Sequence, residues 1–225
     1  MQYHWDFDFI WNSRSLLLLG VLNTFKLAVI SLSAGLLIGL FTGIGRVSPS
    51  RLIRIISSIY TEFFRNVPGI VLIFWFYYAI PVLTGWQATA WLASTVALSL
   101  YTGAYCGEIY RAGIESIEKG QWEAARALGF NRVKQFRYII IPQALSRMIP
   151  AFTNRAIELL KTTTLASSIS LAETLYTAKL LAEDQLRPLE SYTVAAFIFT
   201  IIVLPLSYLA FRLERRMRIA GGHAE

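Results

Sequence analysis

Three long runs without a charged residue constrain the fold of this chain more than any other feature. They cover residues 27–45, 66–107 and 191–211, and they are 19, 42 and 21 residues long. A hydrocarbon core about 30 Å thick is crossed by roughly 20 apolar helical residues. The runs are therefore typical of membrane-spanning helices. The composition agrees, because 55% of the residues are hydrophobic and only 16% are charged.

The runs and their flanks predict an all-α integral membrane protein with five transmembrane helices. The 42-residue run is too long for one helix, and a break between Pro81 and Thr89 divides it between two spans. A further span must carry several charges. The predicted spans are 21–45, 55–80, 90–110, 149–171 and 192–211. The predicted organisation is an outer interfacial segment at 1–20, a membrane domain at 21–211 and a basic tail at 212–225.

The charges of the loops predict the orientation in the membrane. Arginine and lysine exceed acids in the loops at 46–54 and 112–147 and in the tail, whereas the loop at 172–191 is mainly acidic. Because basic loops stay in the cytoplasm, we expect the N-terminus outside and the C-terminus inside. Topology then explains the net charge of +7, and nucleic acid is not expected as a partner.

The chain has few residues suited to enzyme chemistry. Cys106 is the single cysteine, and both histidines, His4 and His223, lie near the termini. These counts argue against a disulfide framework, a zinc site and a Ser-His-Asp triad. The pattern G-x-x-x-x-G-K-[ST], which cradles nucleotide phosphates, does not occur in the sequence. We therefore predict no catalytic residues, no bound metal and no cofactor in this chain.

The loop at 112–147 contains the most specific motif. It reads GQWEAARALG at 120–129, and after nine further residues IIIP at 139–142. Strong helix formers predict a short helix over 121–128, which Gly129 ends with a turn that other residues resist. A second helix over 133–141 is expected to break at Pro142. Taken alone, the pattern also fits a basic interfacial helix that merely caps the bundle.

This motif resembles the signature cytoplasmic loop of bacterial ABC importer permeases, in which it couples the permease to an ATPase. Ile141 stands where leucine is usual, a swap that conserves volume and apolarity. Three further stretches resemble permeases for polar amino acids, a group that includes histidine, glutamate, glutamine, arginine and opine permeases. They read YTEFFRNVP at 60–68, AYCGEIYRAG at 104–113 and NRAIELLKTTTL at 154–165. The matching loop residues are Glu123, Ala124, Ala125, Gly129, Ile139 and Pro142.

The resemblance implies a division of labour among several chains in the bacterial cytoplasmic (inner) membrane. The loop would be a coupling helix seated on a cytoplasmic ATPase subunit, which would hold ATP and magnesium. An extracytoplasmic binding protein would deliver the amino acid. Five spans are few to enclose a pathway, so a second permease, identical or related, is expected. The alternatives are a secondary transporter or channel subunit, which needs no ATPase, and a membrane-embedded enzyme, for which the catalytic residues are missing.

Charged residues inside the predicted spans are the candidates for the substrate pathway. A charge at the bilayer centre costs about 2.5–3.5 kcal/mol on insertion scales, so these residues must face protein or water. A rise of about 1.5 Å per residue puts Arg65 and Lys161 near the midplane, where transporter sites usually lie. The candidates are Glu62, Arg65, Arg155, Glu158, Lys161 and Thr162.

Each of these candidates also has a purely structural explanation. Glu62 could neutralise Arg65, and Glu158 could neutralise Arg155 or Lys161, because residues three apart share a helix face. Thr162 could simply bond within the bundle. The surplus of cations favours an acidic substrate, such as glutamate or aspartate. A free Glu158 would instead favour cationic amino acids or opines, and the partner permease could hold the substrate in place of this chain.

Overall fold

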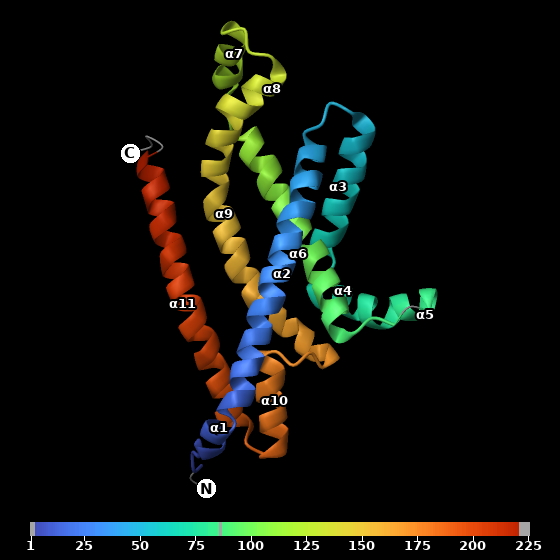
Figure 1. The fold of residues 1–225 in the computed structure, drawn as a ribbon, viewed down its shortest axis with the longest axis vertical. Helices are drawn as coiled ribbons and strands as arrows, with labels where there is room; N and C mark the ends of the chain where they lie inside the picture. The colour runs from blue at the N-terminus through green and yellow to red at the C-terminus, as the bar shows by residue number, and fades with distance from the viewer. Residues whose placement is uncertain (1–2, 86, 221–225) are drawn as a thin grey trace.

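The computed structural model describes residues 3–85 and 87–220, and all regular structure within these ranges is helical. Two long helices, α2 (Arg14–Arg46) and α11 (Pro188–Ala220), extend along the molecule, with α6 (Ala90–Glu115) and α9 (Ile141–Thr162) beside them (Figure 1). The shorter helices are α1 (Asp8–Asn12), α3 (Arg51–Asn66), α4 (Gly69–Phe74), α5 (Ile80–Thr84), α7 (Lys119–Ala127), α8 (Arg132–Gln135) and α10 (Thr174–Asp184). Two π-helical turns, η1 (Trp75–Ala79) and η2 (Phe136–Ile140), and the 3-10 helix η3 (Thr163–Ile169) complete the order.

Small residues hold α2 and α6 together at the centre of the bundle. A β-carbon added to Gly35 would lie 2.7 Å from Cγ2 of Thr102, and one added to Gly39 would overlap Cys106. Cys106 itself is fully buried. Small residues spaced by four along a helix let two membrane helices approach closely. The contact between the backbones of α2 and α6 is therefore a direct product of the sequence.

The all-helical membrane fold is confirmed, whereas the number of spans stays a prediction. In the described residues, α2 and α11 are long and apolar enough to cross a bilayer, and α3 with Gly69–Thr84 would make a third span if the bent pair is one unit. α6 is more polar because its buried face carries hydroxyl and small side chains. α9 carries the charges that the sequence predicts for the fourth span.

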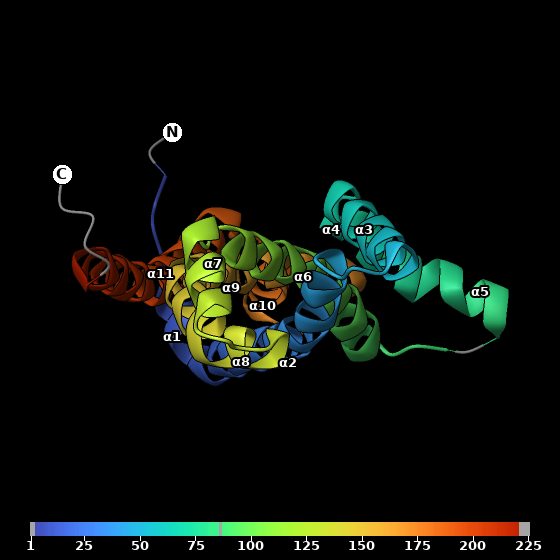
Figure 2. The same cartoon turned by 90° about the horizontal axis from the view of Figure 1, so that it is seen from above.

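The second predicted span, 55–80, is not one continuous helix. α3 ends at Asn66, and the segment Gly69–Thr84 leaves it at 103°. Pro68 causes the break, because it lacks an N–H and pushes Val67 into an extended conformation with a ψ of 129°. Figure 2 shows α5 projecting sideways from the bundle.

The expected helix break at Pro142 is also wrong. α8, η2 and α9 form one continuous helical run from Arg132 to Thr162. The π-helical turn η2 ends two residues before Pro142, and its altered hydrogen-bond ladder accommodates the missing proline N–H. The turn η1 precedes Pro81 in the same way.

Helix boundaries at the other end of the molecule also differ from the prediction. The first long helix begins at Arg14, before the predicted residue 21. The acidic loop at 172–191 contains α10, which the sequence analysis missed. Glu173 caps this helix, because its carboxylate accepts from the N–H groups of Leu175 (2.9 Å) and Tyr176 (2.7 Å). Residues 1–2 and 221–225 of the predicted terminal segments lie outside the described residues.

The basic and acidic loops lie at opposite ends of the molecule. Helices α7 and α8 lie at one end, with the C-terminal end of α11 on the same side, whereas α1 and α10 lie at the other end (Figure 1). Tyr3 joins the N-terminal segment to α11 by donating its hydroxyl to Glu190 Oε2 at 2.5 Å. This separation is what the predicted topology requires.

Candidate functional site

The motif loop, which we define as residues 119–142, forms a projection at one end of the molecule (Figure 1). Gly129 follows Leu128, the C-cap of α7, and has a φ of 75°, which favours glycine. Its N–H donates to the Arg126 carbonyl (2.9 Å), and the Phe130 N–H donates to the Ala125 carbonyl (3.2 Å). These bonds form the glycine-based helix ending that the sequence predicts.

A small apolar core fixes the motif loop to α6 and α9. The Trp122 ring meets the Phe136 ring edge-on at 5.1 Å between centroids. Ile140 is fully buried beside Ile117 and Met148. This core joins α7 to the base of α9.

The outer surface of the motif loop is exposed and combines basic side chains with a few large apolar ones. Leu128 and Val133 keep 70% and 73% of their surface accessible. Exposed apolar patches of this kind are typical of protein contact surfaces. Of the predicted coupling residues, Ala125 is buried, Ile139 is half-buried, and the exposed ones are Glu123, Ala124, Gly129 and Pro142.

Glu108 gathers three arginines from three helices, and we call these four residues the Glu108 cluster. Arg46 donates to the Glu108 carboxylate at 2.5 Å, Arg65 lies 3.7 Å from it, and Arg111 binds it from the next turn of α6. The sequence analysis omits Glu108 from the pathway candidates, and its cationic surroundings agree with a structural role.

The predicted pairing of Glu62 with Arg65 is absent. Glu62 instead binds Arg46 at 3.4 Å, and Arg65 turns toward Glu108. Glu62 and Arg65 thus pair with Arg46 of α2 and Glu108 of α6, and not with each other.

Arg155 is a buried guanidinium held between α6 and α9. Only 3% of its side-chain surface is accessible, and it donates to Glu158 (3.0 Å) and to Thr102 Oγ1 (3.3 Å). The guanidinium carbon lies 4.2 Å from the ring centre of Tyr105 and 4.9 Å from that of Tyr101. Stacking on aromatic faces suits a weakly hydrated guanidinium.

The remaining candidates on α9 are accessible, and we call the four residues Arg155, Glu158, Lys161 and Thr162 the α9 stripe. The Glu158 side chain is 55% exposed, although it pairs with Arg155. Thr162 donates its hydroxyl to the Glu158 carbonyl at 2.8 Å. Lys161 is exposed, and its ammonium group has no hydrogen bond or ion pair within residues 3–85 and 87–220. The stripe can therefore present both a carboxylate and an ammonium group to a ligand.

Tyr105 connects the candidates of α3 with those of α9. The guanidinium of Arg65 lies 5.5 Å from its ring centre, and the Tyr105 hydroxyl donates to the Arg65 carbonyl at 3.4 Å. The sequence analysis missed Tyr101 and Tyr105. Their spacing of four residues inside a predicted span was the available signal, because it puts both rings on one helix face.

Comparisons with known proteins place these features in a family. Residues 35–219 match the family model described as "Binding-protein-dependent transport system inner membrane component". The glutamine transport system permease protein GlnP of Escherichia coli (strain K12) is 34% identical over 220 residues, which are 97% of this chain and 100% of that protein. The probable glutamine ABC transporter permease protein GlnM of Bacillus subtilis (strain 168) is 31% identical over 208 residues, which are 92% of this chain and 96% of that protein.

Solved structures agree with this assignment. An amino acid ABC transporter crystallised with histidines contains a chain with 33% identity and a TM-score of 0.90, and the match covers 95% of this chain and 100% of that one. The inward-facing MetNI methionine ABC transporter shares the fold, with a TM-score of 0.77 and 21% identity over 92% of this chain and 98% of that one. The chain thus belongs to the inner membrane components of binding-protein-dependent transport systems, as a permease subunit of the amino acid ABC importers.

Proposed function

We propose that this chain is the permease subunit of an importer that moves glutamine, or a closely similar polar amino acid, into the cytoplasm. The observation that carries the proposal is the α9 stripe, where an exposed Glu158 carboxylate lies three residues from the unpaired Lys161 ammonium group. The names of the relatives from Escherichia coli and Bacillus subtilis support glutamine.

The α9 stripe matches the charges of an amino acid. Glu158 would accept the α-ammonium group, and Lys161 would bind the α-carboxylate. Arg155 is buried and already bonded, so it positions Glu158 and does not contact the substrate. Thr162 is half-buried one turn from Glu158 and can bond to an uncharged side-chain amide. The expected preference for glutamate or aspartate gains no support from the relatives, whose names specify glutamine.

A cationic amino acid is the second candidate. It is favoured by the exposed half of Glu158, which could bind a side-chain cation, and by the similar transporter crystallised with histidines. Glu158→Gln distinguishes the two candidates. It should slow the uptake of cationic amino acids far more than that of glutamine if Glu158 binds the side chain.

The proposed assembly follows the family. Five spans over 21–211 would place the N-terminus outside, and the motif loop and the tail at 212–225 inside. ATP and magnesium would be held by a separate ATPase subunit that contacts Glu123 and the exposed surface of the motif loop. A second permease would complete the pathway, and a binding protein would deliver the amino acid.

Substrate binding is tested in cells that express the complete transporter. The co-purified binding protein is first screened against the amino acids, and uptake of its best ligand is then measured. Lys161→Met should lower uptake about tenfold or more, since a lost charge-assisted bond is worth about 1.5–3 kcal/mol. Lys179→Met is the control, because Lys179 is an exposed lysine in an i, i+4 pair with Glu183 on α10. Equal uptake by both variants would remove Lys161 from the site.

Coupling is tested with two glycine variants in the motif loop. Gly129→Val should reduce ATPase co-purification and uptake, because valine resists a φ of 75°. Gly120→Val is the matched control, since Gly120 lies on α7 with open space around its α-carbon. Glu123→Lys should also weaken docking through charge reversal. Full uptake in both Gly129→Val and Glu123→Lys would mean that the loop is a passive cap.

Topology is tested with an impermeant thiol reagent in intact cells. Cys106 is buried, so the natural thiol gives little background. Glu183→Cys should be labelled from outside and Lys134→Cys should not, because positive loops stay in the cytoplasm. Labelling of position 134 alone would show that the membrane topology is the reverse of the proposed one.

A further inference from the structure

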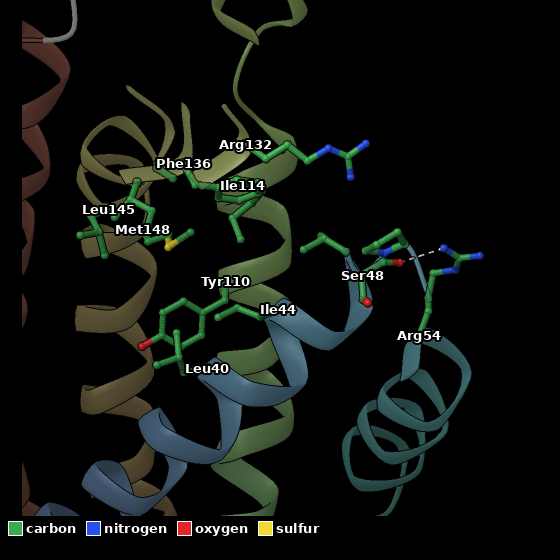
Figure 3. A pocket seen from close by; sticks show the side chains of 14 residues that line it. Leu40, Ile44, Ser48, Arg54, Tyr110, Ile114, Arg132, Phe136, Leu145 and Met148 are labelled. Carbon is green, nitrogen blue, oxygen red and sulfur yellow. Dashed lines mark hydrogen bonds between the residues drawn. The ribbon is translucent and has the colours of Figure 1, made fainter. Parts of the chain in front are cut away.

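A cavity of about 540 Å³ lies beside the motif loop, apart from the α9 stripe and the Glu108 cluster. Its volume falls within the range of about 300–1,000 Å³ that is usual for small-molecule sites. Helices α2, α6 and α9 supply an apolar wall, whereas Arg54 and Arg132 lie on the other side with Ser48 (Figure 3). The cavity is therefore apolar on one side and cationic on the other.

The cationic side has spare hydrogen-bonding capacity. The Arg132 side chain makes no hydrogen bond or ion pair with any described residue, and Arg54 donates one side-chain N–H to the Ser48 carbonyl at 3.1 Å. No acidic residue is among the described residues that line the cavity. An adjoining hollow shares Arg54 and adds Arg46, Lys119 and the acidic Glu115, which pairs with Arg111. The site thus favours a ligand with an anionic head and a long apolar body.

We propose that this cavity binds an anionic phospholipid from the cytoplasmic leaflet. One acyl chain would lie against Leu40, Ile44 and Met148, and the phosphate would be bound by Arg54 and Arg132. Arginine is suited to this role because its planar fork binds phosphate oxygens in pairs. Basic pockets between membrane helices on the cytoplasmic side bind anionic lipid head groups in general. The choice of leaflet rests on the orientation given under Proposed function.

The lipid would support the base of the motif loop. Phe136 and Met148 line the cavity and also belong to, or pack on, the apolar core that holds the loop. A chain bound there adds apolar contact to this core, so anionic lipid should stiffen the connection between the loop and α9.

The test uses the full-length permease, with its co-purified partner subunits, in lipid nanodiscs. Phosphatidylglycerol with a photoactivatable acyl chain is compared with the matching phosphatidylcholine, and the labelled peptides are mapped by mass spectrometry. Phosphatidylglycerol should label the peptides that contain Ile44, Tyr110 or Met148. Arg54→Gln and Arg132→Gln should each lower that labelling about fivefold, as expected for one basic residue near an anionic lipid.

Two further variants make the outcome specific. Arg51→Gln is the matched control, because Arg51 lies on the same helix as Arg54 but does not line the cavity, and its labelling should not change. Ile44→Trp should block labelling of Tyr110 and Met148 without altering charge; Ile44 is half exposed, so the fold should tolerate the change.

Equal labelling by both lipids, or unchanged labelling in the arginine variants and in Ile44→Trp, would overturn the proposal. So would labelling that appears only after the partner subunits are removed, because a protein would then cover the cavity. Uptake is measured with the same purified complexes after reconstitution into sealed proteoliposomes that contain phosphatidylglycerol. Specific labelling together with absent amino acid uptake would support the lipid site and count against the proposed transport function alone.

Discussion

The Glu108 cluster and the α9 stripe contain the same kinds of charge, but they distribute them differently. Glu108 binds three arginines, and 24% of its side-chain surface is accessible. In the stripe, Glu158 has one buried arginine as partner and stays 55% exposed, and Lys161 is unpaired in the described part of the chain. A charge that is fully compensated from several helices fixes the bundle, whereas a partly compensated and accessible charge stays available to a ligand.

The largest effect on stability is expected from Glu108→Gln. Three arginines would then face a neutral amide, and breaking such a network typically costs about 3–5 kcal/mol when the group is fully buried. Because Glu108 is partly exposed, we expect a loss of about 2–3 kcal/mol in the free energy of unfolding. The thermal unfolding midpoint in detergent measures it. Glu115→Gln, which removes a carboxylate paired with Arg111 alone, should have a much smaller effect.

Arg155→Lys should have the next largest effect. The lysine keeps the charge but loses the planar guanidinium that lies against Tyr101 and Tyr105, a loss of about 1–2 kcal/mol. Arg14→Lys is the control, because Arg14 is over the ring of Trp11 in an exposed segment. If the unfolding midpoint falls equally in both variants, the contact of Arg155 with the two tyrosine rings contributes no more to stability than the exposed contact of Arg14 with Trp11.

Glu173 supplies a third case, a buried carboxyl that no cation approaches within salt-bridge distance in the described structure. Burial raises its pKa to about 7, and bonds from the backbone and Thr24 only partly oppose this shift. The folded state therefore prefers the protonated acid more than the unfolded chain does, whose carboxyl has a pKa of about 4.5. The stabilisation that Glu173 contributes is therefore fully present below pH 4.5 and is lost as the pH rises toward 7.

This pH dependence is measured as the unfolding midpoint between pH 4.5 and 8. Glu173→Gln should flatten the decline, because the amide cannot ionise. Glu183→Gln, on the exposed face of α10, should keep it. A flat profile in the unmodified chain would contradict the assignment to Glu173.

The smallest change in stability is expected from Glu158→Gln. Arg155 keeps its bond to Thr102 and its ring contacts, and an amide oxygen at position 158 can still accept from the buried guanidinium. Uptake should change much more than the unfolding midpoint. A variant that unfolded as readily as Glu108→Gln would place Glu158 with the structural charges and leave Lys161 as the remaining site candidate.

The sequence predicts those parts of the molecule that depend on local chemistry. The glycine turn at Gly129 follows from a backbone conformation that few other residues adopt. The long uncharged runs locate α2 and α11, because their outer faces are apolar. Pro142 shows the limit of such rules, since a π-helical turn before it keeps the helix intact, and the Trp122–Phe136 contact that fixes this turn joins separate segments.

The partners of the buried charges could not be predicted in the same way. Glu62 and Arg65 are near neighbours on one helix, so spacing alone suggests that they pair. Their actual partners, Arg46 and Glu108, come from α2 and α6. The relative placement of the helices decides which arginines reach Glu108. A local sequence pattern does not contain this information.

The contact between α2 and α6 limits which parts of the permease can move during transport. Around Gly39 and Gly107 no side chain separates the two backbones, and even a methyl group would collide with the facing helix. Rotation of either helix about its axis would bring larger side chains into this contact. We therefore expect α2 and α6 to move together as one rigid unit. We expect any motion of the permease to use the bend at Pro68 and the helices that flank α2 and α6.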